Sequence, residues 1–145
     1  MPEVVKTVLV AYTPAEMFTL VDAVEDYPAF LPWCGGSELH LRDDEITEAT
    51  IHIRYLQVKQ HFSTRNTKQF PSVMQLRLKE GPFRALDGEW RFKPLGDAAC
   101  KIEFTLRYEF SSTLLAKLLG PVFGHIADTL VDAFVRRAEV VYGER

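Results

Sequence analysis

Residues 100–142 read CKIEFTLRYEFSSTLLAKLLGPVFGHIADTLVDAFVRRAEVVY, and the change of hydrophobic period within this stretch decides the fold. Up to Phe110, apolar and polar residues alternate, which is typical of an antiparallel strand with one buried and one wet face. After residues 111–113, which can cap a helix, apolar residues recur every three or four positions to the end of the stretch. The stretch therefore predicts a strand followed by one long helix, which the Gly-Pro pair at 120–121 should kink.

The residues before this stretch continue the period of two, so the sheet extends toward the N-terminus. Residues 37–95 divide into alternating runs separated by turn residues. A turn at residues 56–57 places Ile51 opposite Phe62 on the inner face of a hairpin, and it also makes sensible pairs on the outer face. These outer pairs are Glu48 with Arg65, Thr50 with Ser63, His52 with His61, and Arg54 with Lys59. With an opening strand at residues 4–10, we expect six to seven antiparallel strands.

Two short helices are expected after the first strand. Thr13, Pro14 and Glu16 have the spacing of a capping box, which predicts the start of the first helix. Asp26 precedes a Tyr-Pro pair in the same cap-then-proline order and should start the second helix. The glycine pair at 35–36 then permits a sharp turn into the sheet.

The order of elements predicts an α+β fold in a single domain, residues 1–145. A helix of about 30 residues spans about 45 Å, so it must lie across the whole inner face of the sheet. A curved sheet around one helix leaves a wedge that side chains fill incompletely, which indicates an apolar pocket. A solid core stays open as the alternative, because protein interiors are normally dense. The candidate lining residues are Phe30, Leu31, Trp33, Phe62, Trp90, Phe92, Tyr108, Phe110, Leu118, Val122, Phe123, Ile126, Leu130 and Phe134.

The composition excludes several classes of protein. Apolar residues make up 47% of the 145 residues and charged residues 26%, which is ordinary for a globular domain. The formal net charge of -3 argues against a non-specific nucleic-acid binder, and we expect no DNA partner. No segment approaches the roughly 20 apolar residues that span a bilayer, and the N-terminus lacks the pattern of a signal peptide. We therefore expect a cytoplasmic protein whose membrane contact is at most peripheral.

The residues that could carry chemistry form no recognisable catalytic set. Cys34 and Cys100 are too few and too far apart for a zinc site or a disulfide framework, and we interpret both as reduced thiols. His52 and His61 face each other across the hairpin, but no third metal ligand lies near them in the sequence. From the sequence we therefore expect no metal site, no required cofactor and no enzymatic activity.

A basic cluster on the hairpin has two interpretations. Arg54 and Lys59 face each other on the outer face, with Arg65 nearby. Like charges in register are mildly unfavourable unless an acidic partner binds them, and an acidic lipid surface or ribosomal RNA would serve. The alternative is a well-hydrated pair of long side chains without a partner.

Three segments carry a resemblance to a known family. Residues 13–18 (TPAEMF), 26–34 (DYPAFLPWC) and 134–143 (FVRRAEVVYG) occur in the order and spacing of that family, and the middle segment is quite specific. The chain resembles the coenzyme Q-binding branch of the START-like (polyketide cyclase/dehydrase) superfamily, which includes bacterial ribosome-association toxins. The resemblance extends over essentially the full chain and implies the helix-grip fold.

The resemblance also implies a function. It implies a tunnel between the sheet and the long helix that holds a polyprenyl lipid such as ubiquinone without catalysis, in support of respiration. Tyr27 and Tyr55 could hydrogen-bond a quinone carbonyl there. The alternative function is that of a ribosome-association toxin, a regulator that binds the large ribosomal subunit, and an enzyme that uses the pocket is a third possibility because START-like folds also host catalysis. The carrier interpretation places the protein in the bacterial cytoplasm or at the periphery of the inner membrane.

Overall fold

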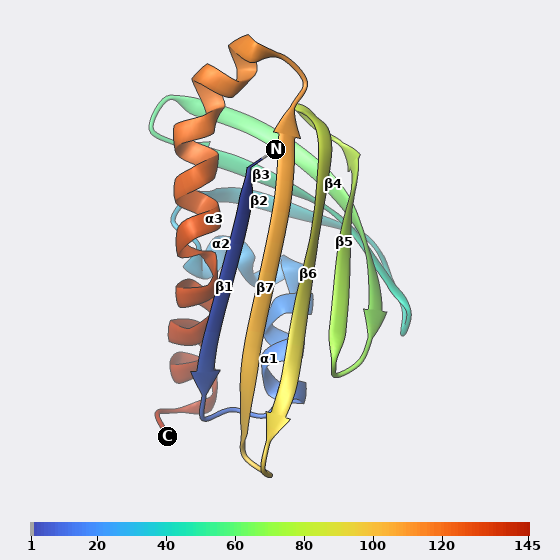
Figure 1. Cartoon of the computed structure of the whole chain (residues 1–145), viewed down its shortest axis with the longest axis vertical. Coiled ribbons are helices and arrows are strands. Elements are labelled where there is room, and N and C mark those ends of the chain that lie inside the picture. Colours follow the sequence, from blue (N-terminus) through green and yellow to red (C-terminus); the bar gives the residue numbers. More distant parts are fainter. Residues whose placement is uncertain (1) are drawn as a thin grey trace.

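The computed structural model describes residues 2–145 and contains one antiparallel sheet with the strand order β1-β7-β6-β5-β4-β3-β2 (Figure 1). The sequence predicted six to seven strands, and the structure has seven. The strands are β1 (Glu3–Val10), β2 (Cys34–Arg42), β3 (Ile46–Tyr55), β4 (Val58–Gln69), β5 (Val73–Glu80), β6 (Phe83–Leu95) and β7 (Ala99–Phe110). The helices are α1 (Pro14–Asp22), the 3-10 turn η1 (Val24–Asp26), α2 (Tyr27–Phe30) and α3 (Thr113–Tyr142).

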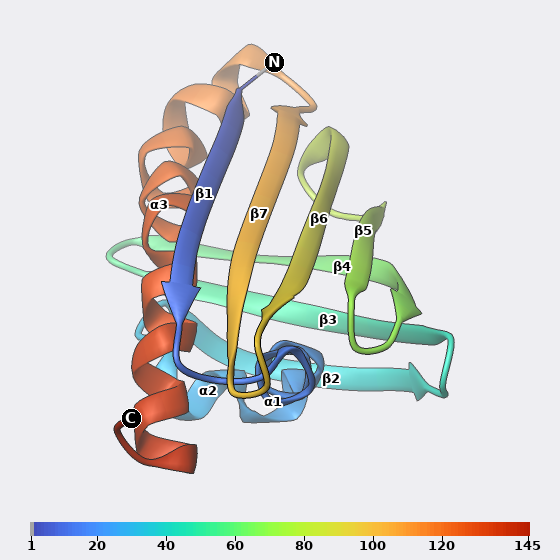
Figure 2. The same cartoon turned by 60° about the horizontal axis from the view of Figure 1, so that its bottom comes forward.

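The sheet curves strongly around α3. Figure 2 shows β2, β3 and β4 running across the direction of β1, β6 and β7, with α3 beside β1 and the short helices at one end of the sheet. The right-handed twist between neighbouring strands accumulates into this curvature. The inner face of the sheet, α1 and α3 therefore enclose the core of the molecule.

The hairpin of β3 and β4 has the predicted register. Ile51 pairs with Phe62, Glu48 with Arg65 and Thr50 with Ser63. Leu56 occupies the turn with a φ of 55°, in the left-handed region that a side chain rarely adopts. These pairs confirm the predicted register. A shift by one residue would have moved the apolar side chains of one strand to the outer face.

In the region of the short helices, one predicted helix start is confirmed and two other predictions are wrong. Thr13 and Glu16 form the predicted capping box at the start of α1. Asp26 makes no capping hydrogen bond through its side chain, so it does not start α2 in the predicted way. Gly35 and Gly36 make no sharp turn, because they lie within β2 at a bulge. A Cβ on Gly35 would lie 2.9 Å from the Cβ of Arg54, so close strand packing explains this glycine.

Helix α3 begins after its N-cap Ser112 and continues through Pro121. Its first turns are inclined to the rest of the helix (Figure 1), as expected for a proline inside a helix. By length and hydropathy α3 could cross a bilayer, which corrects the expectation that no segment approaches such a span. Much of its apolar surface instead faces the sheet. The buried residues of α3 are Leu119, Val122, Phe123, Ile126, Ala127, Val131, Phe134 and Ala138.

Candidate functional site

A cavity of about 90 Å³ lies between the inner face of the sheet and α3. Strands β3 to β7 contribute its floor, α3 contributes its roof, and the segment around α2 closes one end. The cavity is lined almost entirely by aliphatic and aromatic side chains. The lining residues are Val24, Tyr27, Trp33, Ala49, Ile51, Phe62, Thr64, Asn66, Leu76, Leu86, Trp90, Phe104, Leu106, Phe123, Ile126, Ala127, Leu130 and Phe134.

Phe123 of α3 closes the cavity toward the start of the helix. Its ring lies 4.7 Å from Tyr108 and 4.9 Å from Phe83 between centroids, and 6.2 Å from Phe62. These contacts are tilted or edge-on, which is the favoured geometry for aromatic pairs. Beyond them only about 10 Å³ remains open, beside Val122. This end of the interior is therefore a packed core.

Phe134, further along α3, forms the opposite aromatic cluster. Its ring lies 5.5 Å from Trp90, 5.4 Å from Tyr27 and 5.3 Å from Phe30. Ala127 lies between Phe123 and Phe134 on α3 and is fully buried. A methyl side chain between two large aromatic clusters leaves the interior incompletely filled at this point.

Two polar side chains also line the cavity, and the sequence analysis did not identify them. Thr64 and Asn66 lie on the inner face of β4, and both are buried. The carboxamide oxygen Oδ1 of Asn66 has no hydrogen-bond partner among residues 2–145. Leaving a buried acceptor unpaired costs about 1–3 kcal/mol. The alternation in β4 carried the signal, because it places an asparagine and a threonine on the same face as half-buried Phe62.

The predicted lining residues divide into two groups. Those that line the cavity are Trp33, Phe62, Trp90, Phe123, Ile126, Leu130 and Phe134. Leu31, Phe92, Tyr108, Phe110 and Val122 are buried in the core outside the cavity, and Phe30 packs against Phe134 from outside. Leu118 is 60% exposed, which contradicts its predicted inward position. Residue 118 belongs to the first turns of α3, and its side chain points away from the sheet.

Neither predicted tyrosine offers its hydroxyl to the cavity. The ring of Tyr27 lines the cavity, but its hydroxyl donates a hydrogen bond to the carbonyl oxygen of Val21. Burial raises the pKa of Tyr27, so this hydroxyl stays protonated. Tyr55 lies outside the cavity and stacks on His125 of α3, with ring centroids 5.4 Å apart.

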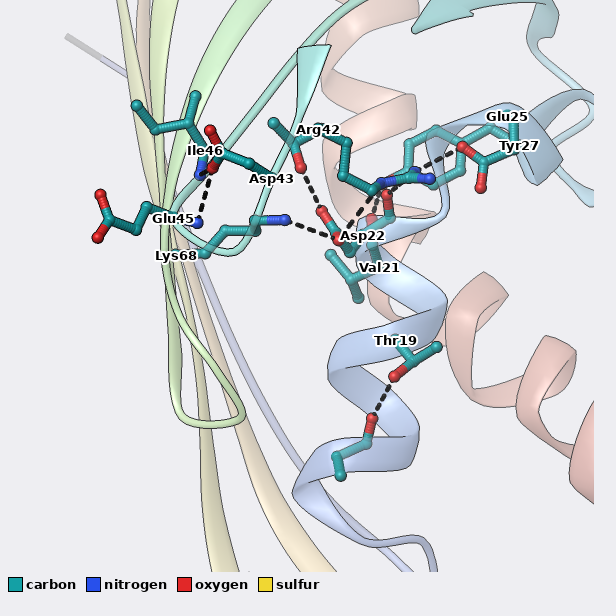
Figure 3. A network of polar contacts seen from close by, with 12 residues as sticks. Thr19, Val21, Asp22, Glu25, Tyr27, Arg42, Asp43, Glu45, Ile46 and Lys68 are labelled. Carbon is teal, nitrogen blue, oxygen red and sulfur yellow. Dashed lines mark hydrogen bonds and ion pairs between the residues drawn. The ribbon is translucent and has the colours of Figure 1, made fainter.

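A polar network closes the end of the inner face beyond Asn66 (Figure 3). Lys68 follows two residues later on β4, and its Nζ lies 3.0 Å from Oδ2 of Asp22 at the end of α1. Oδ1 of Asp22 accepts a hydrogen bond of 2.7 Å from the hydroxyl of Thr47. Arg42 bonds to Glu25 and to the backbone of Asp22, which ties η1 to the end of β2. The network holds the short helices against the sheet.

The predicted basic cluster is smaller than expected. Arg54 and Lys59 face each other in the hairpin and form no ion pair with any residue in the range 2–145. Arg65 instead donates to Glu48 at 2.6 Å, and the same carboxylate accepts from Lys79 at 2.7 Å. Of the three predicted basic residues, only Arg54 and Lys59 therefore lack an acidic partner among residues 2–145.

The titratable side chains form no metal-binding cluster in the described part of the chain. No three histidine, cysteine, aspartate or glutamate residues among positions 2–145 lie close enough to hold a metal ion. Both cysteines are free and buried. Burial raises the pKa of Cys34 and raises that of Cys100 to about 11, so both stay protonated thiols at neutral pH. His52 bonds to Glu38 at 2.8 Å on the outer face, away from the cavity.

A curved antiparallel sheet that encloses a C-terminal helix around an apolar cavity defines a START-like, helix-grip protein, as the resemblance implied. A START superfamily protein of Mycobacterium smegmatis has the same fold, with a TM-score of 0.79 over 96% of this chain and 98% of its own, at 19% identity. The chain belongs to the family described as polyketide cyclase / dehydrase and lipid transport, whose sequence profile matches residues 10–135.

Curated relatives have two kinds of name. A protein of Pseudomonas aeruginosa named ribosome association toxin RatA is 37% identical over 138 residues, covering 95% of this chain and 96% of its own. The coenzyme Q-binding protein COQ10 of Drosophila melanogaster is 29% identical, and the match covers 90% of this chain and 56% of that protein.

Two solved structures complete the comparison. An 18 kDa protein of Caulobacter crescentus is 30% identical, with a TM-score of 0.74 over 99% of each chain. The Zhui aromatase/cyclase of Streptomyces superimposes with a TM-score of 0.82 over 99% of each chain, at 16% identity, and this likeness concerns the fold alone.

Proposed function

We propose that this chain is a non-catalytic binding protein that associates with the large ribosomal subunit. The observation that carries the proposal is the 37% identity to the Pseudomonas aeruginosa protein named ribosome association toxin, which extends over nearly the whole of both chains. A relative from Vibrio cholerae with the same name is also 37% identical, and covers 99% of this chain.

The basic pair on the hairpin is the surface that we assign to this partner. Arg54 and Lys59 are exposed, lie in register and lack acidic partners among residues 2–145. Ribosomal RNA offers phosphates that would relieve the repulsion between them. Because the net charge of the chain is -3, attraction to RNA must come from such a local cluster.

The test is the affinity for purified large subunits as a function of salt. Arg54→Glu and Lys59→Glu should each weaken binding and reduce the slope of log affinity against log salt by about 1. Arg136→Glu is the matched control, because Arg136 is exposed on α3, outside the hairpin, and changes the net charge by the same amount. Equal losses in all three variants would remove the hairpin from the proposal, and no binding by the wild type would remove the ribosome.

We also propose a second candidate function, binding of an apolar ligand such as the head group of a polyprenyl quinone in the cavity. The specific observation in its favour is an apolar cavity with two polar side chains, which is the usual composition of a small-ligand site. The name of the COQ10 relative, a coenzyme Q-binding protein, supports the same ligand class. The two candidate functions use different parts of the molecule and are compatible.

The size of the cavity sets a condition on this second function. A cavity of about 150 Å³ accommodates benzene, whereas this one measures about 90 Å³. A ring can therefore enter only if lining side chains move. Tyr27 of α2 and Leu130 of α3 line the cavity but are only half-buried. We therefore expect the cavity to open where these two helices face each other.

Tryptophan fluorescence provides the direct test. Trp33 and Trp90 are the only tryptophans in the chain, and both line the cavity. Titration with a short-chain ubiquinone, or with its reduced ubiquinol form, should quench their emission in a saturable manner. Ala127→Leu, which fills the cavity from its roof, should abolish the saturable phase. Linear quenching of equal slope in both proteins would overturn the ligand proposal.

A further inference from the structure

Asn66 is the only asparagine in the chain, and it lies in the cavity with an unpaired acceptor. Its side chain is 96% buried, since 4% of the residue surface remains exposed. A polar group in such a position normally has a hydrogen-bond partner. The missing partner is therefore informative about what the cavity holds.

The neighbouring donors are already engaged or absent. Across β3 the residue opposite Asn66 is Thr47, whose hydroxyl donates to Asp22. Across β5 the opposite residue is Leu76, which has no polar group. Lys68, two residues further along the same face, donates to Asp22 at 3.0 Å (Figure 3). Within residues 2–145, therefore, no group donates a hydrogen bond to Oδ1 of Asn66.

A water molecule is a poor substitute for this donor. A buried water normally makes about three hydrogen bonds. Besides Asn66 and Thr64, the lining offers only the indole N–H groups of Trp33 and Trp90, because the remaining groups are apolar or, like the hydroxyl of Tyr27, bonded elsewhere. A ligand with an apolar body and one donor group matches this lining better.

We propose that the cavity takes a ligand whose polar end is a hydroxyl group, as in a phenol, a quinol or an alcohol, and that Asn66 binds this hydroxyl. The inference rests on the second candidate function, ligand binding in the cavity. A hydroxyl suits a carboxamide in either orientation, because it can donate to the oxygen and accept from the amide nitrogen. In the orientation that the structure gives Asn66, a carbonyl group can only accept, so a quinone would leave Oδ1 unpaired. The cavity therefore selects the reduced, hydroxylated form of such a head group.

Phenol and toluene are the probes that test this inference, since they differ only by a hydroxyl in place of a methyl group. An entirely apolar cavity prefers toluene, because entry of phenol strips water from its hydroxyl without compensation. We expect the wild-type protein to bind phenol roughly tenfold more tightly than toluene in titrations followed by NMR, the size of effect expected from one good hydrogen bond.

Two variants separate the role of Asn66 from general effects. Asn66→Leu, of similar size and without the unpaired acceptor, should reverse the preference to toluene and melt no lower than the wild type. Thr67→Val is the matched control, because Thr67 is the next residue of β4 and is exposed on the opposite face. The control should keep the preference for phenol.

The outcomes distinguish the inference from the function on which it rests. Toluene bound as tightly as phenol by the wild type would overturn the hydroxyl inference and leave the cavity as a ligand site. Binding of neither probe would overturn both. An unchanged preference for phenol in Asn66→Leu would show that another group recognises the hydroxyl and would remove Asn66 from the proposal.

Discussion

Replacing Ala127 by leucine should stabilise the protein, whereas the same change at Ala138 should destabilise it. Both alanines are fully buried on α3, and they are separated by about three helical turns on the same face. Ala127 borders the cavity of about 90 Å³, and Ala138 does not. The pair therefore isolates the effect of the empty space.

The magnitude follows from the three carbon atoms that leucine adds. If the cavity receives them without strain, their burial at about 0.8 kcal/mol each adds about 2 kcal/mol to the free energy of unfolding. At Ala138 the added atoms meet packed neighbours, and overpacking costs about 1–3 kcal/mol. We expect the two variants to differ by about 3–5 kcal/mol in denaturant titrations monitored by circular dichroism. Equal destabilisation of both would refute the claim that the cavity is usable space.

Three further predictions concern other parts of the structure. Asp22→Asn should lower the free energy of unfolding by about 3–5 kcal/mol, because it leaves the buried ammonium of Lys68 without its carboxylate; a loss below about 1 kcal/mol in urea titrations would contradict this assignment. The hydrogen bond from Arg145 holds the pKa of Glu16 below its ordinary value of 4.5, so its carboxylate stabilises the fold above that pH and ceases to do so as the pH falls through the lowered folded-state pKa. The stability difference between the wild type and Glu16→Gln should accordingly be present at pH 7 and shrink below about pH 4.5, and a difference that grows on acidification would disprove the link. Cys100 should react with a thiol reagent at pH 7.5 only after unfolding, because burial raises its pKa, and rapid labelling of the native protein would contradict its placement.

The strands could be predicted from the sequence because each residue pattern has only one way to bury its apolar face. The β3–β4 hairpin shows this most clearly, since Ile51 pairs with Phe62 while Glu48 pairs with Arg65 in the same register. The capping box at Thr13 is equally local, because both of its hydrogen bonds form within one helical turn.

The failures arise where distant segments decide the local structure. Gly35 resembles a turn residue in the sequence, but it is required by the approach of Arg54 from β3. Leu118 fits the helical period, yet in the first turns of α3 the buried side chains are those of Leu119 and Val122, and Leu118 is exposed. The sequence could not identify Asn66 as a site residue. That its side chain lacks a hydrogen-bond partner depends on the residues that β3 and β5 place beside it.

The second candidate function and the hydroxyl inference both require that the cavity hold a ligand. Mass spectrometry of an organic extract from the purified protein measures this most directly. The account predicts a hydroxylated apolar compound in amounts comparable to the wild-type protein, and its depletion from Ala127→Leu purified in the same way. An extract of the wild type without such a compound, or equal amounts from both proteins, would contradict it.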